Sequence, residues 1–327
     1  MPKRIIIKEI GDPSVLTLEE YSLPKNINDN DVRILNKSIG VNYIDTYHRS
    51  GLYKLPQKFP ICPGLEGAGE VIGIGKNVKN LNIGNKICYA SPPLGAYCEI
   101  RDFPSDKLIK IPETISYDDA ASSLLQGMTV EYLFERLYKL KKNEIFLFHA
   151  AAGGVGLIAS QWAKSIGAKM IGTVSTDEKS LLAKKNGCEY TINYRSQNVI
   201  EEVMKITNNE GVSVVYDGVG NDTFETSISC LRLRGLMVSF GQSSGMVNEV
   251  DLHKTFNPKS LYYTRPTLMH YTKNRTELEL SSNTLFDKIK KNEIKPNLSE
   301  IFNLKNASEA HIKLQSRKTY GSIILKP

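Results

Sequence analysis

A glycine-rich run between two differently patterned segments carries the strongest chemical signal in the sequence. The run Ala151-Ala152-Gly153-Gly154-Val155-Gly156 follows the apolar segment 145–149 and precedes a segment with helical spacing. On the pattern Gly-x-Gly-x-x-Gly, Gly153 and Gly156 match, and Ala151 replaces the first glycine. The second glycine lets the backbone approach a pyrophosphate, and the third lets the helix pack closely on the strand. The run therefore predicts a dinucleotide-binding turn; the alternative is a turn with a structural role only.

The end of the next expected strand indicates which dinucleotide binds. Proteins that bind NAD place a carboxylate about 20 residues further on, where it binds the ribose 2′-hydroxyl. Here Ser175 and Thr176 stand at the strand end, and Lys179 follows them. Hydroxyls and a cation suit a 2′-phosphate, so the sequence favours NADPH over NADH. The acidic pair 177–178 argues the other way, unless it pairs with the dipole of the helix that begins there.

Cysteines and histidines stand at spacings that do not suit a metal site. No two cysteines form Cys-x-x-Cys, and we expect each of the five histidines to be structural or on the surface. A tetrahedral zinc site needs four nitrogen or sulfur ligands, so we expect no metal. Unpaired cysteines at wide spacing indicate small buried residues in a reducing, cytoplasmic compartment. They are Cys62, Cys88, Cys98, Cys188 and Cys230.

Composition bounds the function further. The 327 residues allow one or two domains, and 41% hydrophobic with 24% charged residues is ordinary for a soluble globular protein. The net charge of +7 is mild and no long block of like charges occurs, so a nucleic-acid-binding tail is not indicated. The N-terminal apolar run is too short for a secretory signal. Segment 145–163 lacks charged residues, but its glycines and polar residues argue against a membrane span.

The first section of the chain, residues 1–124, is rich in expected strands. β-Branched residues mix with polar ones, and glycines interrupt the pattern repeatedly. This predicts a bent, partly closed antiparallel sheet, with helices at 42–49 and 117–125. The expected strands are 5–10, 16–21, 32–38, 70–74, 86–89 and 96–100.

The second section, residues 125–264, alternates short apolar runs with helical patterns after an initial helix at 129–138. Six strands with intervening helices predict a parallel, doubly wound α/β sheet of the Rossmann type. The expected strands are 145–149, 169–174, 190–193, 213–217, 236–240 and 261–264, and the helices between them are 157–166, 178–186, 199–207 and 223–231.

The third section, residues 265–327, shows no evident core of its own. Helices are expected at 276–292 and 307–316, and a last strand at 322–325. We expect this section to pack on the first one, so that 1–124 and 265–327 form one discontinuous domain.

Seven longer runs form a specific set. They are Gly40-Val-Asn-Tyr-Ile-Asp-Thr-Tyr47, Arg49-Ser-Gly-Leu-Tyr53, Pro63-Gly-Leu-Glu-Gly-Ala-Gly69, Gly127-Met-Thr-Val130, Phe146-Leu-Phe-His-Ala-Ala-Ala-Gly-Gly-Val-Gly156, Val215-Tyr-Asp217 and Gly235-Leu-Met-Val-Ser-Phe-Gly241. With them, the chain resembles the zinc-less NADPH:quinone oxidoreductases, the zeta-crystallin-like branch of the medium-chain dehydrogenase/reductase superfamily. The resemblance runs from Lys3 to the C-terminus. It implies a GroES-like, mainly antiparallel β catalytic domain beside the Rossmann domain, and NADPH-dependent reduction of a quinone.

One departure from the superfamily pattern bears on mechanism. Zinc alcohol dehydrogenases carry Gly-His-Glu where this chain has Gly64-Leu65-Glu66, and their early cysteine ligand is replaced in the run 42–45. Without a Lewis acid, the alkoxide formed from a simple ketone would lack stabilisation. A quinone or other conjugated acceptor spreads its charge instead. We therefore expect catalysis by orientation in a dry cleft between the domains, at the carboxyl ends of the Rossmann strands.

The resemblance also implies individual site residues. Asn42, Tyr47 and Tyr53 would position substrate and nicotinamide, with no identified acid–base residue. The residues implied in cofactor binding are Tyr43, Ile44, Asp45, Thr46, Tyr47, Tyr132, Gly153, Gly154, Val155, Ser175, Thr176, Lys179, Tyr194, Val219, Ser243, Ser244, Pro266, Thr267, Leu268 and Arg317. Other roles are open for some: Asn42 as a helix N-cap, Tyr43 and Ile44 as core residues, and Arg317 as a partner of a helix C-terminus.

Two further function classes remain open. One is reduction of an enone or alkenal double bond with the same cofactor. The other is a non-catalytic role, since relatives of this kind serve as lens proteins or bind RNA. The run Tyr262-Tyr263-Thr264-Arg265 mixes basic and aromatic residues, but we interpret it as an edge strand. Such an edge favours a homodimer formed by strand pairing, as the resemblance also implies.

Overall fold

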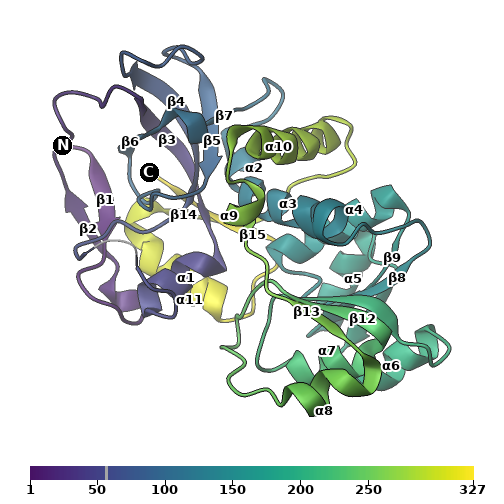
Figure 1. Ribbon diagram of the computed structural model, residues 1–327. Coiled ribbons are helices and arrows are strands. Elements are labelled where there is room, and N and C mark those ends of the chain that lie inside the picture. Colours follow the sequence, from purple (N-terminus) through teal and green to yellow (C-terminus); the bar gives the residue numbers. More distant parts are fainter. Residues whose placement is uncertain (56–57) are drawn as a thin grey trace. The chain divides into compact units, whose positions relative to one another are not determined.

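The chain forms two compact units in this computed structural model, which describes residues 1–55 and 58–327 (Figure 1). The first unit comprises residues 1–128, 272–292 and 296–327, and the second comprises 129–271 and 293–295.

These boundaries differ by a few residues from those drawn from the sequence at 124 and 264. Helix α3 (Leu124–Glu131) runs across the first boundary without a break. Near the second boundary, the ring of Tyr271 stacks on Tyr132 with centroids 4.4 Å apart, so helix α9 (Leu268–Tyr271) belongs to the second unit.

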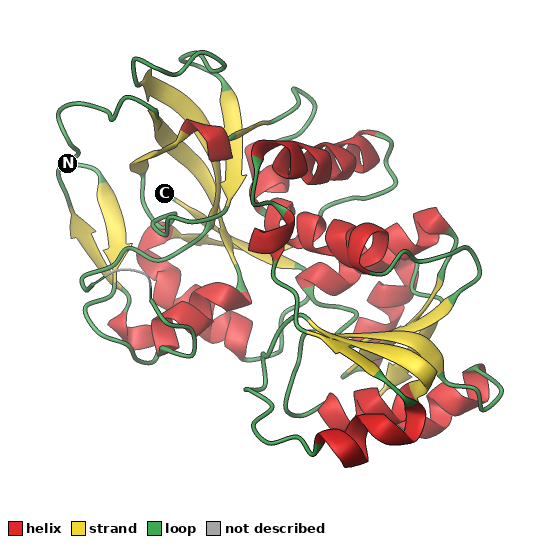
Figure 2. Ribbon diagram, in the orientation of Figure 1, coloured by secondary structure: helices red, strands yellow, loops and turns green. Residues whose placement is uncertain are grey.

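A seven-stranded sheet organises the first unit (Figure 2). Along the sheet the order is β14-β15-β3-β4-β5-β7, and β6 also pairs with β3. Only β14 and β15 pair in parallel; the other described pairs of this sheet are antiparallel. The strands are β3 (Asp31–Val41), β4 (Glu66–Ile74), β5 (Lys86–Ala90), β6 (Ile100–Pro104), β7 (Ile109–Lys110), β14 (Leu298–Asn303) and β15 (Ser322–Lys326). Strands β1 (Lys3–Ile6) and β2 (Thr17–Glu20) form a separate antiparallel pair.

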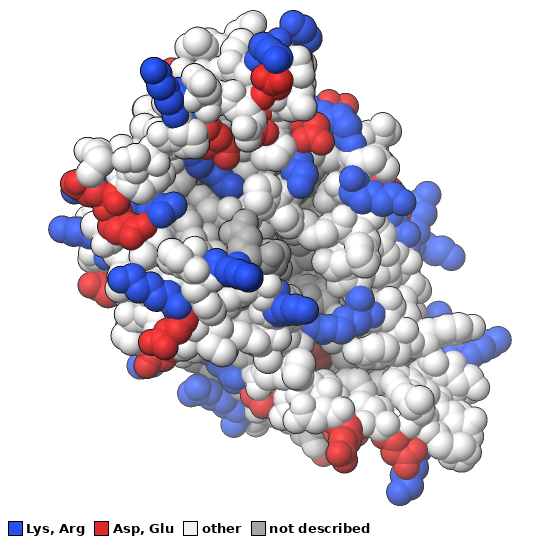
Figure 3. Space-filling view, turned by 60° about the vertical axis from the view of Figure 1, so that its left-hand side comes forward, with Lys and Arg blue, Asp and Glu red and all other residues white. Residues whose placement is uncertain are grey.

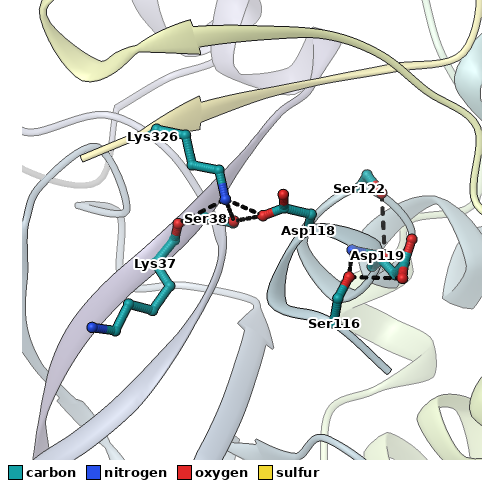
Figure 4. Close-up of polar contacts among 7 residues, drawn as sticks. All are labelled: Lys37, Ser38, Ser116, Asp118, Asp119, Ser122 and Lys326. Atoms are coloured by element: carbon teal, nitrogen blue, oxygen red, sulfur yellow. Dashed lines mark hydrogen bonds and ion pairs between the residues drawn. The ribbon is translucent and has the colours of Figure 1, made fainter. Parts of the chain in front are cut away.

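The C-terminal strand is part of this sheet, because Ile324 of β15 pairs with Gly40 of β3. Polar contacts reinforce this pairing at the surface. Lys326 of β15 and Ser38 of β3 both contact the carboxylate of Asp118 in α2 (Figure 4). The third section of the sequence is thus fastened to the first by the sheet and by this cluster. The helices of the unit are α1 (Tyr43–Ser50), α2 (Tyr117–Ala121), α10 (Arg275–Lys290) and α11 (Ala307–Gln315).

A six-stranded parallel sheet organises the second unit, in the order β10-β9-β8-β11-β12-β13. Helices lie on both of its faces (Figure 1). The strands are β8 (Ile145–Phe148), β9 (Lys169–Val174), β10 (Tyr190–Asn193), β11 (Val212–Asp217), β12 (Leu231–Ser239) and β13 (Tyr262–Thr264). The helices are α4 (Gly154–Ile166), α5 (Asp177–Lys185), α6 (Val199–Ile206), α7 (Phe224–Cys230) and α8 (Leu252–Phe256), besides α9. The predicted fold class, a Rossmann sheet with a mainly antiparallel second sheet, is confirmed.

Some predicted elements are wrong in detail. The strand expected at 96–100 lies later, as β6, and the backbone of Tyr97 instead accepts from Ile5 at 2.8 Å. The helix expected at 129–138 starts earlier, as α3, and continues as a π-helical turn from Tyr132 to Leu137. Strand β14 has no counterpart among the predicted elements.

The apolar length of the helices and the distribution of surface charge bear on what the chain could bind. Among the described residues, no helix is both long and apolar enough to cross a membrane. Basic and acidic side chains are interspersed on the face drawn in Figure 3.

Candidate active site

The glycine-rich loop joins strand β8 to helix α4. Gly153 is the N-cap of α4, and Gly154 and Val155 open its first turn. A Cβ at Gly156 would lie 2.4 Å from the carbonyl oxygen of Ala150, whereas a Cβ at Gly153 would lie 3.3 Å from that oxygen. Close packing of the helix on the loop therefore needs Gly156, and the space beside Gly153 is more open. The first amides of a helix have no partner within it, so this end suits a pyrophosphate.

Ala151 stands where the dinucleotide pattern has its first glycine. The opposing strand makes room for its methyl group, since a Cβ at Gly172 of β9 would lie 2.4 Å from the Cβ of Ala151. The Ala151 amide donates to the Thr173 carbonyl at 3.0 Å. Gly172 in β9 thus provides the space for the Ala151 side chain, so the loop can do without a glycine at position 151.

A buried polar layer supports the loop from beneath. His149 Nδ1 lies 3.1 Å from Thr173 Oγ1, and its Nε2 lies 3.0 Å from Ser227 Oγ. Ser227 in turn donates to Asp217 at 2.7 Å. The other carboxylate oxygen of Asp217 accepts from the Val219 amide at 2.7 Å. This layer joins the ends of β8, β9 and β11 to helix α7 and sets the backbone of Val219.

A hydrolase triad contains the same residue types as His149, Ser227 and Asp217. The hydrogen bonds between these three side chains, however, connect them in a different order from a triad. Ser227 lies between the other two and donates to the carboxylate, and all three are at most 2% exposed. In a nucleophilic triad the imidazole lies between the hydroxyl and the carboxylate. The arrangement is therefore structural, and burial lowers the pKa of His149, which keeps the ring neutral.

Strands β9 and β10 end close to one another, where the sequence predicts the adenosine phosphate. Thr176 is the N-cap of helix α5 and accepts from the Lys179 amide at 3.2 Å. Ser175 precedes it, and Tyr194 follows β10 with its amide bonded to the Val174 carbonyl at 3.1 Å. The structure thus brings together the four residues predicted at this point from two separate segments.

Two cations meet at this end of the sheet. Burial lowers the pKa of Lys179, and the neighbouring charge of Arg195 lowers it further. Asp177, which argued for NAD, accepts from the side chain of Asn193 at 3.0 Å. A 2′-phosphate would relieve the repulsion between Lys179 and Arg195, so these residues fit NADPH.

Hydrogen bonds join the loop that follows β11 to the loop that follows β12. Ser244 Oγ donates to the Val219 carbonyl at 2.8 Å, and the Ser243 amide donates to the Gly218 carbonyl at 3.2 Å. Arg265 fastens the same loop by donating to Gln242 Oε1 at 2.6 Å. These contacts gather Val219, Ser243 and Ser244, as predicted, at the carboxyl ends of two neighbouring strands.

Tyr132 and the segment around Leu268 lie in the second unit. The Tyr132 ring is 1% exposed and stacks on Tyr271, and the guanidinium of Arg136 lies 5.2 Å from the centroid of the Tyr271 ring. Pro266 and Thr267 lead into helix α9, and Leu268 is buried. A cofactor contact for these four predicted residues stays a prediction.

In the first unit, Asn42 stands at the junction of β3 and α1. It is the N-cap residue of the helix, and its side chain has another partner: Nδ2 donates to Glu66 Oε2 at 2.6 Å. The second oxygen of Glu66 accepts from the Leu125 amide at 2.7 Å. Burial is the main cause that raises the pKa of Glu66 to about 8, so the carboxyl is protonated at neutral pH. N-capping is thus not the only contact of Asn42.

The side chain of Asp45 is buried inside the first unit. Its Oδ2 accepts from the Asn42 amide at 2.9 Å and from the Tyr97 hydroxyl at 3.1 Å, and burial raises its pKa to about 7. The Tyr97 hydroxyl also lies 2.9 Å from His311 Nε2, and Arg49 Nη1 lies 3.2 Å from His311 Nδ1. Asp45 therefore anchors the start of α1 to the helix α11; its predicted contact with the cofactor stays a prediction.

Three tyrosines follow in succession along and after helix α1. The rings of Tyr47 and Tyr53 have centroids 5.1 Å apart, and those of Tyr43 and Tyr47 are 6.3 Å apart. Tyr43 and Ile44 are only partly buried, which argues against a pure core role. The hydroxyl of Thr46 is bonded to the Tyr43 carbonyl at 2.7 Å. The cluster offers aromatic surface of the kind that a planar substrate needs.

Arg317 follows helix α11 and has a left-handed backbone, with φ of 57°. Burial raises the pKa of Tyr43, and the nearby charge of Arg317 opposes this rise. The charge of Arg317 thus acts on Tyr43, and the predicted contact of Arg317 with the cofactor stays a prediction.

Metal-ligating side chains do not gather in the described part of the chain, in which no three of His, Cys, Asp and Glu are placed to share an ion. Leu65, at the histidine position of the zinc enzymes, is 1% exposed and packs in the core.

Two protein families match different segments of the chain. Residues 28–113 match the alcohol dehydrogenase GroES-like domain, and residues 154–283 match the zinc-binding dehydrogenase family. A quinone oxidoreductase of Pseudomonas aeruginosa is 44% identical, and quinone oxidoreductase 1 of Escherichia coli 47% identical, each over 100% of both chains. The chain belongs to the quinone oxidoreductase family of the medium-chain dehydrogenase/reductase superfamily.

Solved structures of the quinone oxidoreductase family have the same fold. The Escherichia coli quinone oxidoreductase complexed with NADPH superimposes with a TM-score of 0.97 at 47% identity, covering 99% of this chain and 100% of that one. A 2-haloacrylate reductase structure gives 0.86 at 39% identity over 99% of each chain. The curated 2-haloacrylate reductase of a Burkholderia species is 40% identical over 98% of both chains.

Several residues that hold the candidate site residues in place have no signal in the sequence that marks this role. The sequence indicates only an edge strand around Arg265, yet this residue donates to Gln242 in the loop after β12. Glu66 belongs to one of the family motifs, but the motif does not predict its hydrogen bond with Asn42. Tyr97 and His311 carried no local signal, because they are 214 residues apart and meet only in the fold.

Proposed function

We propose that this chain is an NADPH-dependent quinone oxidoreductase. Identity of 44–47% along the full length of curated bacterial quinone oxidoreductases carries the proposal. The paired cations Lys179 and Arg195 support NADPH as the reductant. When bound, NADPH supplies the hydride for the reduction.

Residues of the second unit bind and orient NADPH in this proposal. The open N-terminus of α4 at Gly153 holds the pyrophosphate, and Lys179 with Arg195 holds the 2′-phosphate. In the first unit, Asn42, Tyr47 and Tyr53 position the acceptor and the nicotinamide. A quinone spreads the incoming charge through its ring, so orientation supplies most of the rate and no alkoxide needs a Lewis acid. The proposal therefore includes activity without zinc.

A second activity is favoured by one observation. The 2-haloacrylate reductase at 40% identity acts, by its name, on a conjugated double bond. An activated alkene and a quinone both delocalise the negative charge, so the same site suits both.

Assay of the purified chain with a panel of quinones and enones, each with NADPH and NADH, tests this function by cofactor absorbance. Turnover of quinones that is faster with NADPH supports the main proposal. Turnover of enones alone would replace it with the second activity, and no turnover with either class would overturn both.

The proposal extends to a homodimer formed by the edge strand β13 in the cytoplasm. Tyr262 is 63% exposed on that strand, and Leu252 close by in sequence is 70% exposed. An exposed edge strand invites pairing with its own copy about a two-fold axis. Five free cysteines suit a reducing compartment.

A further inference from the structure

Glu66 is a buried carboxyl next to Asn42, and a role for it rests on the proposed function of Asn42. Glu66 is 1% exposed at the start of strand β4. Its two oxygens accept from donors on different elements: the side chain of Asn42, at the junction of β3 and α1, and the Leu125 amide in helix α3. One side chain thus links three segments of the first unit around Asn42.

The backbone makes space for this carboxyl. A Cβ at Gly40 would lie 2.2 Å from Glu66 Oε2 and 2.4 Å from the Ala121 carbonyl oxygen. Gly40 on β3 is therefore required for the carboxyl to reach Asn42. Helix α2, which contains Ala121, is held to β3 and β15 by the contacts of Asp118 shown in Figure 4. Strand β3, at Gly40, and helix α2, at Ala121, thus both border the space that the Glu66 carboxyl occupies.

The contacts determine the orientation of the Asn42 amide. A side-chain amide has two N–H donors and one carbonyl oxygen. Nδ2 is committed to Glu66 at 2.6 Å, and Oδ1 lies 3.4 Å from Gln126 Nε2. Gln126 is itself held by Ser322 Oγ, 2.9 Å from its Oε1. With one N–H and the plane of the amide fixed, the direction of the second N–H is fixed as well.

A carboxyl group suits this position better than an amide. Two donors, from Asn42 and Leu125, converge on residue 66, and a carboxyl accepts at both oxygens whereas a glutamine accepts at one. Burial raises the pKa of Glu66 to about 8, and nearby Asp45 adds to the rise, so the group carries no charge at neutral pH and needs no cation partner. A neutral carboxyl accepts at its carbonyl oxygen and through a lone pair of its hydroxyl oxygen, whereas the NH2 group of a glutamine cannot accept, and it avoids the cost of a buried charge.

We infer that Glu66 is a positioning residue, which holds the side-chain amide of Asn42 in the orientation that directs its second N–H to the substrate or nicotinamide. Glu66 itself touches neither. Its effect passes through Asn42, and it sets the rate of reduction more than the affinity for NADPH, whose phosphates bind in the second unit.

A double-mutant cycle tests this inference. We compare Glu66→Gln, Asn42→Ala and the double variant, with Glu70→Gln on the same strand as the matched control. A misplaced positioning group costs about tenfold to a hundredfold in rate, so kcat should fall by about tenfold or more in Glu66→Gln. The Kd for NADPH should stay unchanged. In the Asn42→Ala background, Glu66→Gln should have little further effect on kcat, because contacts that act through each other are not additive.

Each kcat is expressed per NADPH-binding site counted by titration, so that partial unfolding of a variant does not count as lost catalysis. Glu66→Asp, which keeps the carboxyl but withdraws it, provides a second variant and should also lower kcat. Effects of Glu66→Gln and Asn42→Ala that multiply in the double variant would overturn the inference and leave the role of Asn42 intact. An unchanged kcat for Asn42→Ala would overturn that role and this inference together. Wild-type activity on quinones is the separate test of the proposed function.

Discussion

Arg49 donates to Nδ1 of His311 across a distance of 3.2 Å, deep in the first unit. Since a guanidinium can only donate, Nδ1 must accept, and the ring proton lies on Nε2. Nε2 then donates to the Tyr97 hydroxyl, and that hydroxyl donates to Asp45 Oδ2. A directed chain of hydrogen bonds thus joins helix α11 to the first turn of helix α1. It fixes the helix on which Asn42 and Tyr47 depend.

This chain predicts a pH dependence of stability. Burial, together with Arg49, lowers the pKa of His311 from 6.5 to about 3. Below pH 6.5 the unfolded chain takes up a proton at His311 that the folded chain refuses, so the contribution of His311 to the free energy of unfolding falls as pH decreases towards 3. The raised pKa values of Asp45 and Glu66 contribute with the opposite sign. The slope from one such group is at most about 1.4 kcal/mol per pH unit. His311→Asn should remove this contribution, so that the free energy of unfolding falls less, or rises more, between pH 7 and pH 5 in denaturant unfolding than in the unmodified chain. His253→Asn, at an exposed site, is the control, and equal slopes in both variants would contradict the prediction.

Substitutions of Gly153 and Gly156 in the glycine-rich loop should affect different properties of the protein. Gly156→Ala places a Cβ 2.4 Å from the Ala150 carbonyl, and overpacking of this kind costs about 1–3 kcal/mol of unfolding free energy. Gly153→Ala leaves 3.3 Å and should keep its stability, but the added methyl group should weaken NADPH binding. Thermal unfolding and cofactor titration separate the two effects. Unchanged NADPH affinity in Gly153→Ala would place the pyrophosphate elsewhere.

The sequence predicted elements with a local signal and missed those made by distant contacts. Strand β9 was predicted at the observed bounds, because a parallel strand buried on both faces is mostly apolar and does not alternate between apolar and polar residues. Strand β14 was missed: its residues are only partly buried or exposed, and its pairing with β15 defines it. In the site, the glycine loop is a contiguous motif, whereas Asn42 and Glu66 lie 24 residues apart and meet only through the pairing of β3 with β4.

Lys179→Ala should weaken the binding of NADPH more than that of NADH. Lys179 is part of the cation pair with Arg195, and losing a hydrogen bond to a charged phosphate costs on the order of 1–3 kcal/mol. Fluorescence titration with both cofactors measures the difference. Lys185→Ala, at an exposed position of the same helix, should change neither affinity. An equal loss for the two cofactors in Lys179→Ala would remove Lys179 from the 2′-phosphate site.

Quinone reduction should survive treatment with chelators. The buried Leu65 stands where the zinc enzymes have a histidine ligand, so the site lacks a nitrogen donor at that point. Elemental analysis of the active protein should find zinc well below one atom per chain. One tightly bound zinc per chain, with activity lost on its removal, would contradict the proposal of zinc-independent catalysis.

Tyr262→Pro should shift the proposed homodimer towards monomer. Strand β13 is the last strand of its sheet, and its inner edge pairs with β12, where Tyr262 lies opposite Leu236. Proline removes a backbone donor from the strand. Position 262 is a better choice than 263, because the ring of Tyr263 packs against Phe256, with centroids 5.9 Å apart, whereas Tyr262 is 63% exposed. Tyr262→Ala is the matched control: it removes the same ring and keeps the backbone N–H. Light scattering at micromolar concentration should give a dimer for the unmodified chain and for Tyr262→Ala, and mostly monomer for Tyr262→Pro. A monomeric unmodified chain, or a proline variant that stays dimeric, would show that β13 does not form the interface.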